Sequence, residues 1–205
     1  QQVGRYDGAL AYRIGPVGGD VIREGSTPVG GTADVIVPEA KPGLYTLWLD
    51  AGMNSCSVRS DVRHVVYEAS ESSPLQMIYH APQLFFWVPA GAKSVSLTVG
   101  GGGKSEAAAF SVYDASGAIV AEGDSRTDKG AVTLAVGTGQ AGTAWSVVLR
   151  KLGEVTFEDF SLVLGGDAVP FVAESAGRLV VPALHPYAVV ADEGVALGVR
   201  VNVDV

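Results

Sequence analysis

Paired carboxylates are the first residues of this sequence that could carry out chemistry, because glycoside hydrolysis needs two of them flanking a sugar. The chain has 205 residues, of which 22 are Asp or Glu. Most of the candidate carboxylates lie in expected turns, where Asp commonly caps the local backbone. Nothing in their spacing brings two of them together. The sequence therefore leaves the question of an enzyme open and favours a non-catalytic protein.

Nucleophilic and metal chemistry has equally few candidates. Cys56 is the single cysteine, and either His64 or His80 could in principle form a Cys–His pair with it. No G-x-S-x-G motif is present, and the spacing of the three histidines does not match a zinc motif. Cysteine is among the most buried residue types, so packing is the default role of Cys56.

A glycine-rich stretch at residues 99–105 partly imitates a phosphate-binding loop. Gly103, Lys104 and Ser105 match the end of G-x-x-x-x-G-K-[ST], but Thr98 occupies the position of the first glycine. The following residues alternate as a strand does, so no helix N-terminus would face a phosphate. A glycine-rich hairpin loop is the better interpretation.

Aromatic residues are the best evidence for binding, because a ring can stack on the apolar face of a sugar while polar groups hold its hydroxyls. Phe85 and Trp87 alternate with apolar residues in the run 84–88. They either form a platform or belong to a strand that is buried on both faces. Tyr113 precedes an expected hairpin turn, and Trp48 alternates within residues 44–50. The competing interpretation of each ring is an ordinary core aromatic.

The elements that must position these rings are β-strands. Apolar residues fall at every second position in runs separated by glycine and proline, which is typical of antiparallel sheets with one buried face. The runs recur at the short spacing expected of a β-sandwich. Among them are residues 84–88, 95–99, 132–136, 145–149 and 160–164. In the run 145–149, Trp145 continues the face of Val147 and Leu149, which indicates a core position.

We predict an all-β protein consisting of a jelly-roll β-sandwich and a second, smaller N-terminal β-sandwich. Ala81 and Pro82 interrupt the pattern just before the densest aromatic run. The predicted domains are therefore residues 1–80, the jelly-roll at 81–166, and a C-terminal β segment at 167–205 docked onto a sandwich. The last run, residues 195–203, reads as a half-buried strand that could pair back onto the N-terminal part.

Charge and hydropathy restrict the partners. The net charge is −8, whereas nucleic acids and anionic lipids require clustered Lys and Arg, and the 14 basic residues are scattered. No apolar run approaches the 18 residues of a membrane span. A single cysteine slightly favours a reducing compartment, yet many secreted bacterial proteins lack disulfides, so export remains open.

Residues 84–165 resemble the galactose-binding-like jelly-roll carbohydrate-binding modules of secreted bacterial polysaccharide-degrading enzymes. Three segments carry the resemblance: the aromatic strand and proline turn at 85–99, the hairpin at 111–123, and the closing strands at 143–149 and 155–164. The resemblance implies an extracellular or cell-surface location. It also implies a structural Ca²⁺, for which the acidic pair Glu158 and Asp159 matches in residue type.

The sequence thus predicts a non-catalytic, carbohydrate-binding accessory module. Its partners would be a polysaccharide or glycan and other domains of a larger chain. Its ligand-binding candidates are Trp87, Tyr113, Trp48 and Phe85. The alternative is a structural or cell-surface β-sandwich module that spaces or docks other domains.

Overall fold

The computed structural model describes residues 8–17, 19–41, 43–52, 54–60, 62, 64–101, 106–126, 130–179 and 197–204. The chain divides into two compact units. Unit 1 contains Gln1–Arg63 and Pro182–Val205, and unit 2 contains His64–Val181. Unit 2 is therefore inserted into the sequence of unit 1, and each unit is described by itself.

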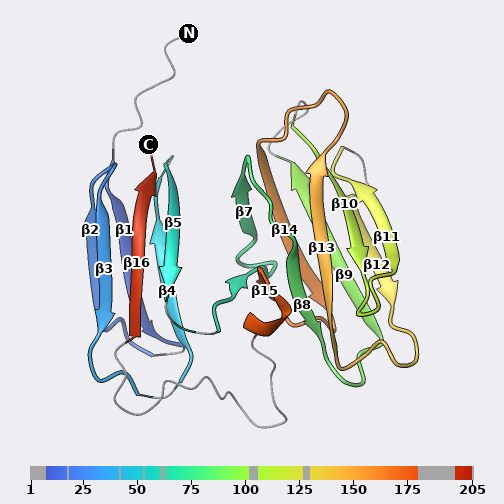
Figure 1. The fold of residues 1–205 in the computed structure, drawn as a ribbon, viewed down its shortest axis with the longest axis horizontal. Helices are drawn as coiled ribbons and strands as arrows, with labels where there is room; N and C mark the ends of the chain where they lie inside the picture. Colours follow the sequence, from blue (N-terminus) through green and yellow to red (C-terminus); the bar gives the residue numbers. More distant parts are fainter. Residues whose placement is uncertain are drawn as a thin grey trace. The chain divides into compact units, whose positions relative to one another are not determined.

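Unit 1 consists of two antiparallel three-stranded sheets (Figure 1). One has the order β2-β1-β4 and the other the order β3-β16-β5. The strands are β1 (Leu10–Pro16), β2 (Arg23–Thr27), β3 (Thr32–Val37), β4 (Tyr45–Asp50), β5 (Ser55–Ser60) and β16 (Leu197–Asp204). The central strand of the second sheet thus comes from the C-terminal part of the sequence.

The core of unit 1 lies between these two sheets. Alternating residues of β1 and β3 supply most of its buried side chains, namely Leu10, Tyr12, Ile14, Val35 and Val37. Cys56 and Val58 of β5 pack against them. Cys56 therefore has the packing role that its residue type suggests.

Unit 2 is a β-sandwich of two unequal antiparallel sheets (Figure 1). The large sheet has the order β11-β10-β13-β8-β15-β6, and the small sheet has the order β12-β9-β14-β7. The strands of the large sheet are β6 (Tyr67–Glu68), β8 (Leu84–Val88), β10 (Ala108–Tyr113), β11 (Ile119–Asp124), β13 (Thr143–Lys151) and β15 (Phe171–Ala173). Those of the small sheet are β7 (Leu75–Ile78), β9 (Ser94–Gly101), β12 (Ala131–Ala135) and β14 (Asp159–Gly166).

Successive strands of unit 2 pass from one sheet to the other, except at the β10–β11 hairpin. The expected hairpin at the glycine-rich stretch is wrong, because β9 belongs to the small sheet and β10 to the large one. Residues 102–105 lie outside the described part of the chain. After them the chain forms a β-bridge between Glu106 and Thr156 and then enters β10, as the alternation in the sequence predicts.

The core of unit 2 lies between the facing sides of its two sheets. Alternation along β8 buries Leu84, Phe86 and Val88, each at most 1% exposed. The small sheet contributes the matching residues of β9 and β14, which are Val95, Leu97, Val99, Phe160, Leu162 and Leu164. Trp145 of β13 is 1% exposed and lies next to Phe86, with a distance of 6.3 Å between the ring centroids. The core position inferred for Trp145 is confirmed.

The all-β sandwich class is confirmed, whereas the predicted domain limits differ from the division in the structure. Strands β6 and β7 lie within the predicted N-terminal domain, but they pair with β15 and β14 of unit 2. Within the predicted C-terminal segment 167–205, β15 belongs to unit 2 and β16 to unit 1. A short 3-10 turn, η2 (Ala176–Arg178), follows β15.

Candidate functional site on the large sheet of unit 2

The outer face of the large sheet carries half-buried aromatic rings. Because Leu84, Phe86 and Val88 point into the core, Phe85 and Trp87 must lie on the opposite face of β8. Both are partly exposed, so β8 is not buried on both faces. The outer face of β8 is therefore partly open to solvent.

Two of the predicted ring residues occupy one row across the strands. Phe85 of β8 is directly opposite Ser146 of β13, and Ser146 is in turn opposite Tyr113 of β10. Neighbouring strands lie about 4.8 Å apart, which separates the backbones of Phe85 and Tyr113 by roughly 10 Å. The Ser146 hydroxyl therefore lies between two aromatic positions.

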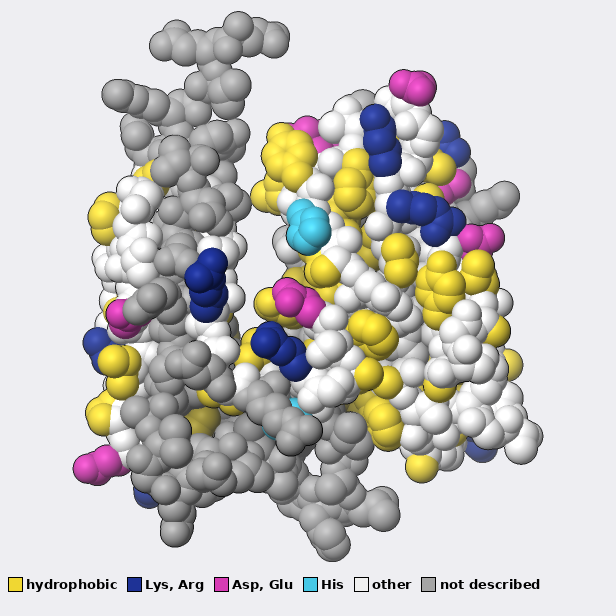
Figure 2. All heavy atoms as spheres, in the orientation of Figure 1, with side chains coloured by type: hydrophobic (Ala, Val, Ile, Leu, Met, Phe, Trp, Pro, Cys, Tyr) yellow, Lys and Arg dark blue, Asp and Glu magenta, His cyan; other side chains and the backbone are white. Residues whose placement is uncertain are grey.

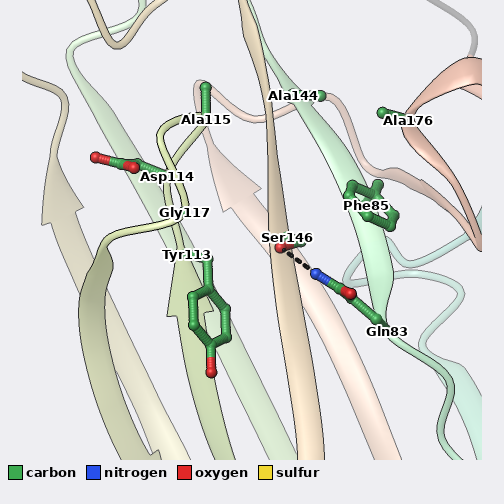
Figure 3. A pocket seen from close by; sticks show the side chains of 9 residues that line it. All are labelled: Gln83, Phe85, Tyr113, Asp114, Ala115, Gly117, Ala144, Ser146 and Ala176. Atoms are coloured by element: carbon green, nitrogen blue, oxygen red, sulfur yellow. Dashed lines mark hydrogen bonds between the residues drawn. The ribbon is translucent and has the colours of Figure 1, made fainter.

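Ser146 is held by a side chain that the sequence analysis did not single out. The amide Nε2 of Gln83 donates a hydrogen bond to Ser146 Oγ at 2.9 Å. Figure 3 shows this pair between the rings of Phe85 and Tyr113. Ser146 is 4% exposed, whereas Gln83 is exposed, so the amide can also meet a ligand.

These residues form the floor of a shallow depression with a volume of about 440 Å³. Its walls come from the turn of the β10–β11 hairpin and from η2. The lining residues are Gln83, Phe85, Tyr113, Asp114, Ala115, Gly117, Ala144, Ser146 and Ala176 (Figure 3). The depression thus combines aromatic rings with an amide, two hydroxyls and one carboxylate.

The carboxylate of Asp114 organises the hairpin wall. Its Oδ1 accepts hydrogen bonds from the backbone N–H of Ser116 at 2.8 Å and of Ala118 at 3.1 Å, and from Ser116 Oγ at 2.6 Å. Its Oδ2 accepts from Gln140 Nε2 at 3.0 Å. These bonds, that of the Ser116 hydroxyl above all, hold the pKa of Asp114 below its ordinary value. Gly117 completes the turn with a φ of 83°, a conformation that favours glycine.

A polar network continues the same face beyond the depression. Ser111 lies two residues before Tyr113 on β10, and it is fully buried beneath Arg150 and Glu122. Arg150 donates to Ser111 Oγ at 2.5 Å and to Glu122 Oε1 at 2.9 Å, while Ser111 donates to Glu122 at 2.7 Å. The bond from Ser111, followed by that from Arg150, lowers the pKa of Glu122. This network fixes the charged side chains of Arg150 and Glu122 at the surface.

The other predicted rings lie outside the depression. Trp87 is opposite Ala144, so it occupies the next row on the same face as Phe85. Trp48 belongs to β4 of unit 1 and is 40% exposed. The guanidinium carbon of Arg13 lies 6.0 Å from the centroid of its ring, within the range of a cation–π contact.

Glu158 and Asp159 lie at the start of β14, on the small sheet. Glu158 accepts a hydrogen bond from the hydroxyl of Tyr79, and Asp159 is exposed. Among the described residues no group of three His, Cys, Asp or Glu side chains could hold a metal ion. Ca²⁺ takes 6–8 oxygen ligands, so two adjacent carboxylates would need backbone carbonyls or water to complete the shell.

The histidines near Cys56 in the sequence have other surroundings. Cys56 packs in the core of unit 1, whereas His64 belongs to unit 2. The Nδ1 atom of His64 lies 3.2 Å from the carbonyl oxygen of Leu179, within hydrogen-bonding distance.

On the face that Figure 2 shows, Lys and Arg side chains lie at several places, some of them beside Asp or Glu. In the part of the chain that the structure describes, no helix is long and apolar enough to span a membrane.

No protein-family model and no curated protein matches the chain. Among solved structures, a subviral particle of the infectious bursal disease virus protein VP2 aligns with 98% of this chain and 58% of its own, at 8% identity and a TM-score of 0.18. A structure of the Gt strain of the same virus aligns with 94% of this chain and 47% of its own, at 12% identity and a TM-score of 0.16. The chain therefore spans about half the length of these structures.

Proposed function

We propose that unit 2 binds a glycan on the outer face of its large sheet and performs no catalysis. The observation that carries this proposal is the row in which Phe85 and Tyr113 flank the Gln83–Ser146 pair. Partly exposed rings can stack on the apolar faces of sugars, while the amide and the hydroxyls can exchange hydrogen bonds with the sugar's own hydroxyls.

The carboxylate in the depression supports a binding role rather than hydrolysis. Asp114 is the single carboxylate among the nine lining residues, and each of its oxygens accepts hydrogen bonds from the chain. A glycosidase of the usual kind needs two carboxylates on either side of the scissile bond. Asp114 instead stabilises the hairpin that walls the depression.

On this proposal, the protein is an accessory module of a secreted bacterial protein, located outside the cell or at its surface. Its partners are a polysaccharide or glycan and the other domains of a larger chain.

A glycan array probed with the whole 205-residue chain tests the proposal, followed by calorimetry with the best ligand. Tyr113→Ala should weaken binding at least tenfold without lowering the melting temperature appreciably, because the ring is partly exposed. The matched control is Tyr79→Ala, which removes a ring that is 65% exposed and outside the depression. Failure of the natural chain to bind any glycan, or equal affinity of Tyr113→Ala, would refute the proposal.

The alternative function, a structural or cell-surface docking module, has its own supporting observation on the small sheet. Gly100 is opposite Ser161, and Gly165 is opposite Ser96, on adjacent strands β9 and β14. Each serine Oγ lies within 2.6 Å of where a Cβ on the facing glycine would be. At these four positions the outer face carries no side chain larger than serine, which would let another surface approach closely there. A docking module would bind no sugar, and neither ring substitution would then affect its activity.

A further inference from the structure

Strand β16 occupies a slot in unit 1 between two strands from the N-terminal part of the chain. Leu197–Asn202 pair with β3, and Val199–Asp204 pair with β5. A central strand satisfies the backbone N–H and C=O groups of both neighbours. Without β16, the facing edges of β3 and β5 would each present an unpaired row of these groups, which is a template for an incoming strand.

The strand that fills the slot, β16, lies far along the sequence from β3 and β5. Residues 61–196 separate the end of β5 from the start of β16, a loop of 196 − 60 = 136 residues. Unit 2, however, holds the two ends of this loop together. Val172 of β15 pairs with Tyr67 of β6, and His64 Nδ1 lies 3.2 Å from the carbonyl oxygen of Leu179.

Folding of unit 2 therefore shortens the loop that must close. Only residues 61–63 and 180–196 then remain between the clamped ends and the two strands, which is 3 + 17 = 20 residues. Because closure probability falls as the three-halves power of loop length, shortening from 136 to 20 residues favours closure about 18-fold. The chain's own β16 is thus the favoured occupant in dilute solution.

A second copy of the chain carries the same strand and can make the same backbone pairs. A strand that is tethered to its slot competes with strands of other chains at an effective concentration that reaches the millimolar range for short tethers. Exchange of an identical element between copies preserves every native contact. Its free-energy cost is therefore little more than that of bringing the two chains together. We propose that the slot between β3 and β5 is a strand-acceptor site that takes β16 from a second copy of this chain. This exchange occurs when the concentration of folding chains is comparable to the effective concentration of the chain's own strand.

The register supplies a direct test, because Val203 of β16 is opposite Cys56 of β5. Directly opposed residues of antiparallel strands have Cα atoms about 4.5–5.5 Å apart, which lies within the range that a disulfide requires. The donor chain carries Cys56→Ser and Val203→Cys, and the acceptor is the natural chain. Each then has a single cysteine, so a bond between residues 56 and 203 can form only between chains.

The two chains are unfolded, mixed one to one, refolded at rising concentration, oxidised, and digested for mass spectrometry. We expect linked peptides joining residues 56 and 203, with a linked fraction that rises about tenfold for a tenfold rise in dilute concentration. In a control donor, Asn202→Cys replaces Val203→Cys. Residue 202 is opposite Ser57 rather than Cys56, so this donor should not link.

A further variant carries Val203→Cys in the natural chain, which keeps Cys56. In dilute solution it should form a disulfide between residues 56 and 203 within one chain, which shows that the chain's own β16 occupies the slot. If this variant closes but the mixture never yields the interchain bond, exchange does not occur and the proposal is overturned. If the variant fails to close, β16 does not occupy the slot in this register, and the proposal fails for that reason.

Discussion

Phe85 and Tyr113 lie in one cross-strand row of unit 2, each directly opposite Ser146. Their spacing is set by the backbone ladders of β8, β13 and β10 rather than by loops. A site on regular strands is preorganised, so little conformational entropy is lost when a ligand binds. The two rings and the Gln83–Ser146 bond therefore form a fixed pattern, which any ligand bound there would have to match.

Adjacent phenylalanines of β8 should respond in opposite ways to truncation. Phe86→Ala should cost about 3–5 kcal/mol of unfolding free energy, because its ring is fully buried in the core. Phe85→Ala should cost clearly less, since its ring lies partly exposed on the outer face, but it should abolish glycan binding. Urea unfolding and calorimetry measure both effects. A loss of stability in Phe85→Ala as large as that in Phe86→Ala would mean that the ring is a core element.

Trp87 should matter for long ligands more than for short ones. It lies one row beyond the depression, opposite Ala144, so only a chain that extends past Phe85 would reach it. Trp87→Ala should therefore weaken binding of a long oligosaccharide several-fold and leave a disaccharide unaffected. The matched core variant, Trp145→Ala, should cost about 3–5 kcal/mol of stability. Equal losses for both ligand lengths in Trp87→Ala would place its ring inside the primary site.

Calcium should raise the stability of unit 2 if Glu158 and Asp159 help to bind it. A metal that binds only the folded state shifts the unfolding equilibrium by mass action, so the melting temperature should fall when a strong chelator is added. A double variant that carries Glu158→Gln and Asp159→Asn should lose that dependence. Because Glu158 also accepts a bond from Tyr79, Tyr79→Phe is the control for loss of that bond alone. Superimposable melting curves of the natural chain would contradict the calcium prediction.

Asp167 should make stability depend on pH in the acid range. Its Oδ2 accepts from the backbone N–H groups of Lys93 at 2.8 Å and Ser94 at 3.1 Å, and these bonds lower its pKa from the ordinary value of 3.8. A lowered folded-state pKa contributes stability that is present above pH 3.8 and is lost as the pH falls through the folded value. Asp167→Asn should therefore be less stable than the natural chain at pH 7. The urea midpoints of the two proteins should converge as the pH falls through the lowered pKa of Asp167 in the folded state. A difference between the midpoints that stays constant across the acid range would exclude this origin.

Much of the fold follows from local pattern. In β8 the two-residue period places Leu84 and Phe86 on the opposite face from Phe85, and the structure has this division. Such alternation is reliable because one wrong register would move a whole apolar set into water. The core position of Trp145 follows from the same reasoning.

The division of the chain depends on pairing between distant residues, which local pattern does not encode. Strands β6 and β7 resemble N-terminal strands in composition, and only their pairing with β15 and β14 places them in unit 2. Only part of the candidate site follows from local pattern, for the same reason. Phe85 and Tyr113 were singled out by residue type, but Gln83 and Ser146 gain their role from a contact across 63 residues. The signal in the sequence is a polar residue, Ser146, between the apolar residues Trp145 and Val147.

The placement of β16 has a mechanical consequence. Strand β1 begins and β16 ends at the same end of unit 1, so polypeptide attached before the one and after the other would pull on unit 1 from that end (Figure 1). Tension between these attachments would be borne by unit 1. Unit 2, inserted between β5 and β16, would carry no load until β16 was pulled from between its neighbours. Its rings could then hold a ligand while the flanking polypeptide was under strain.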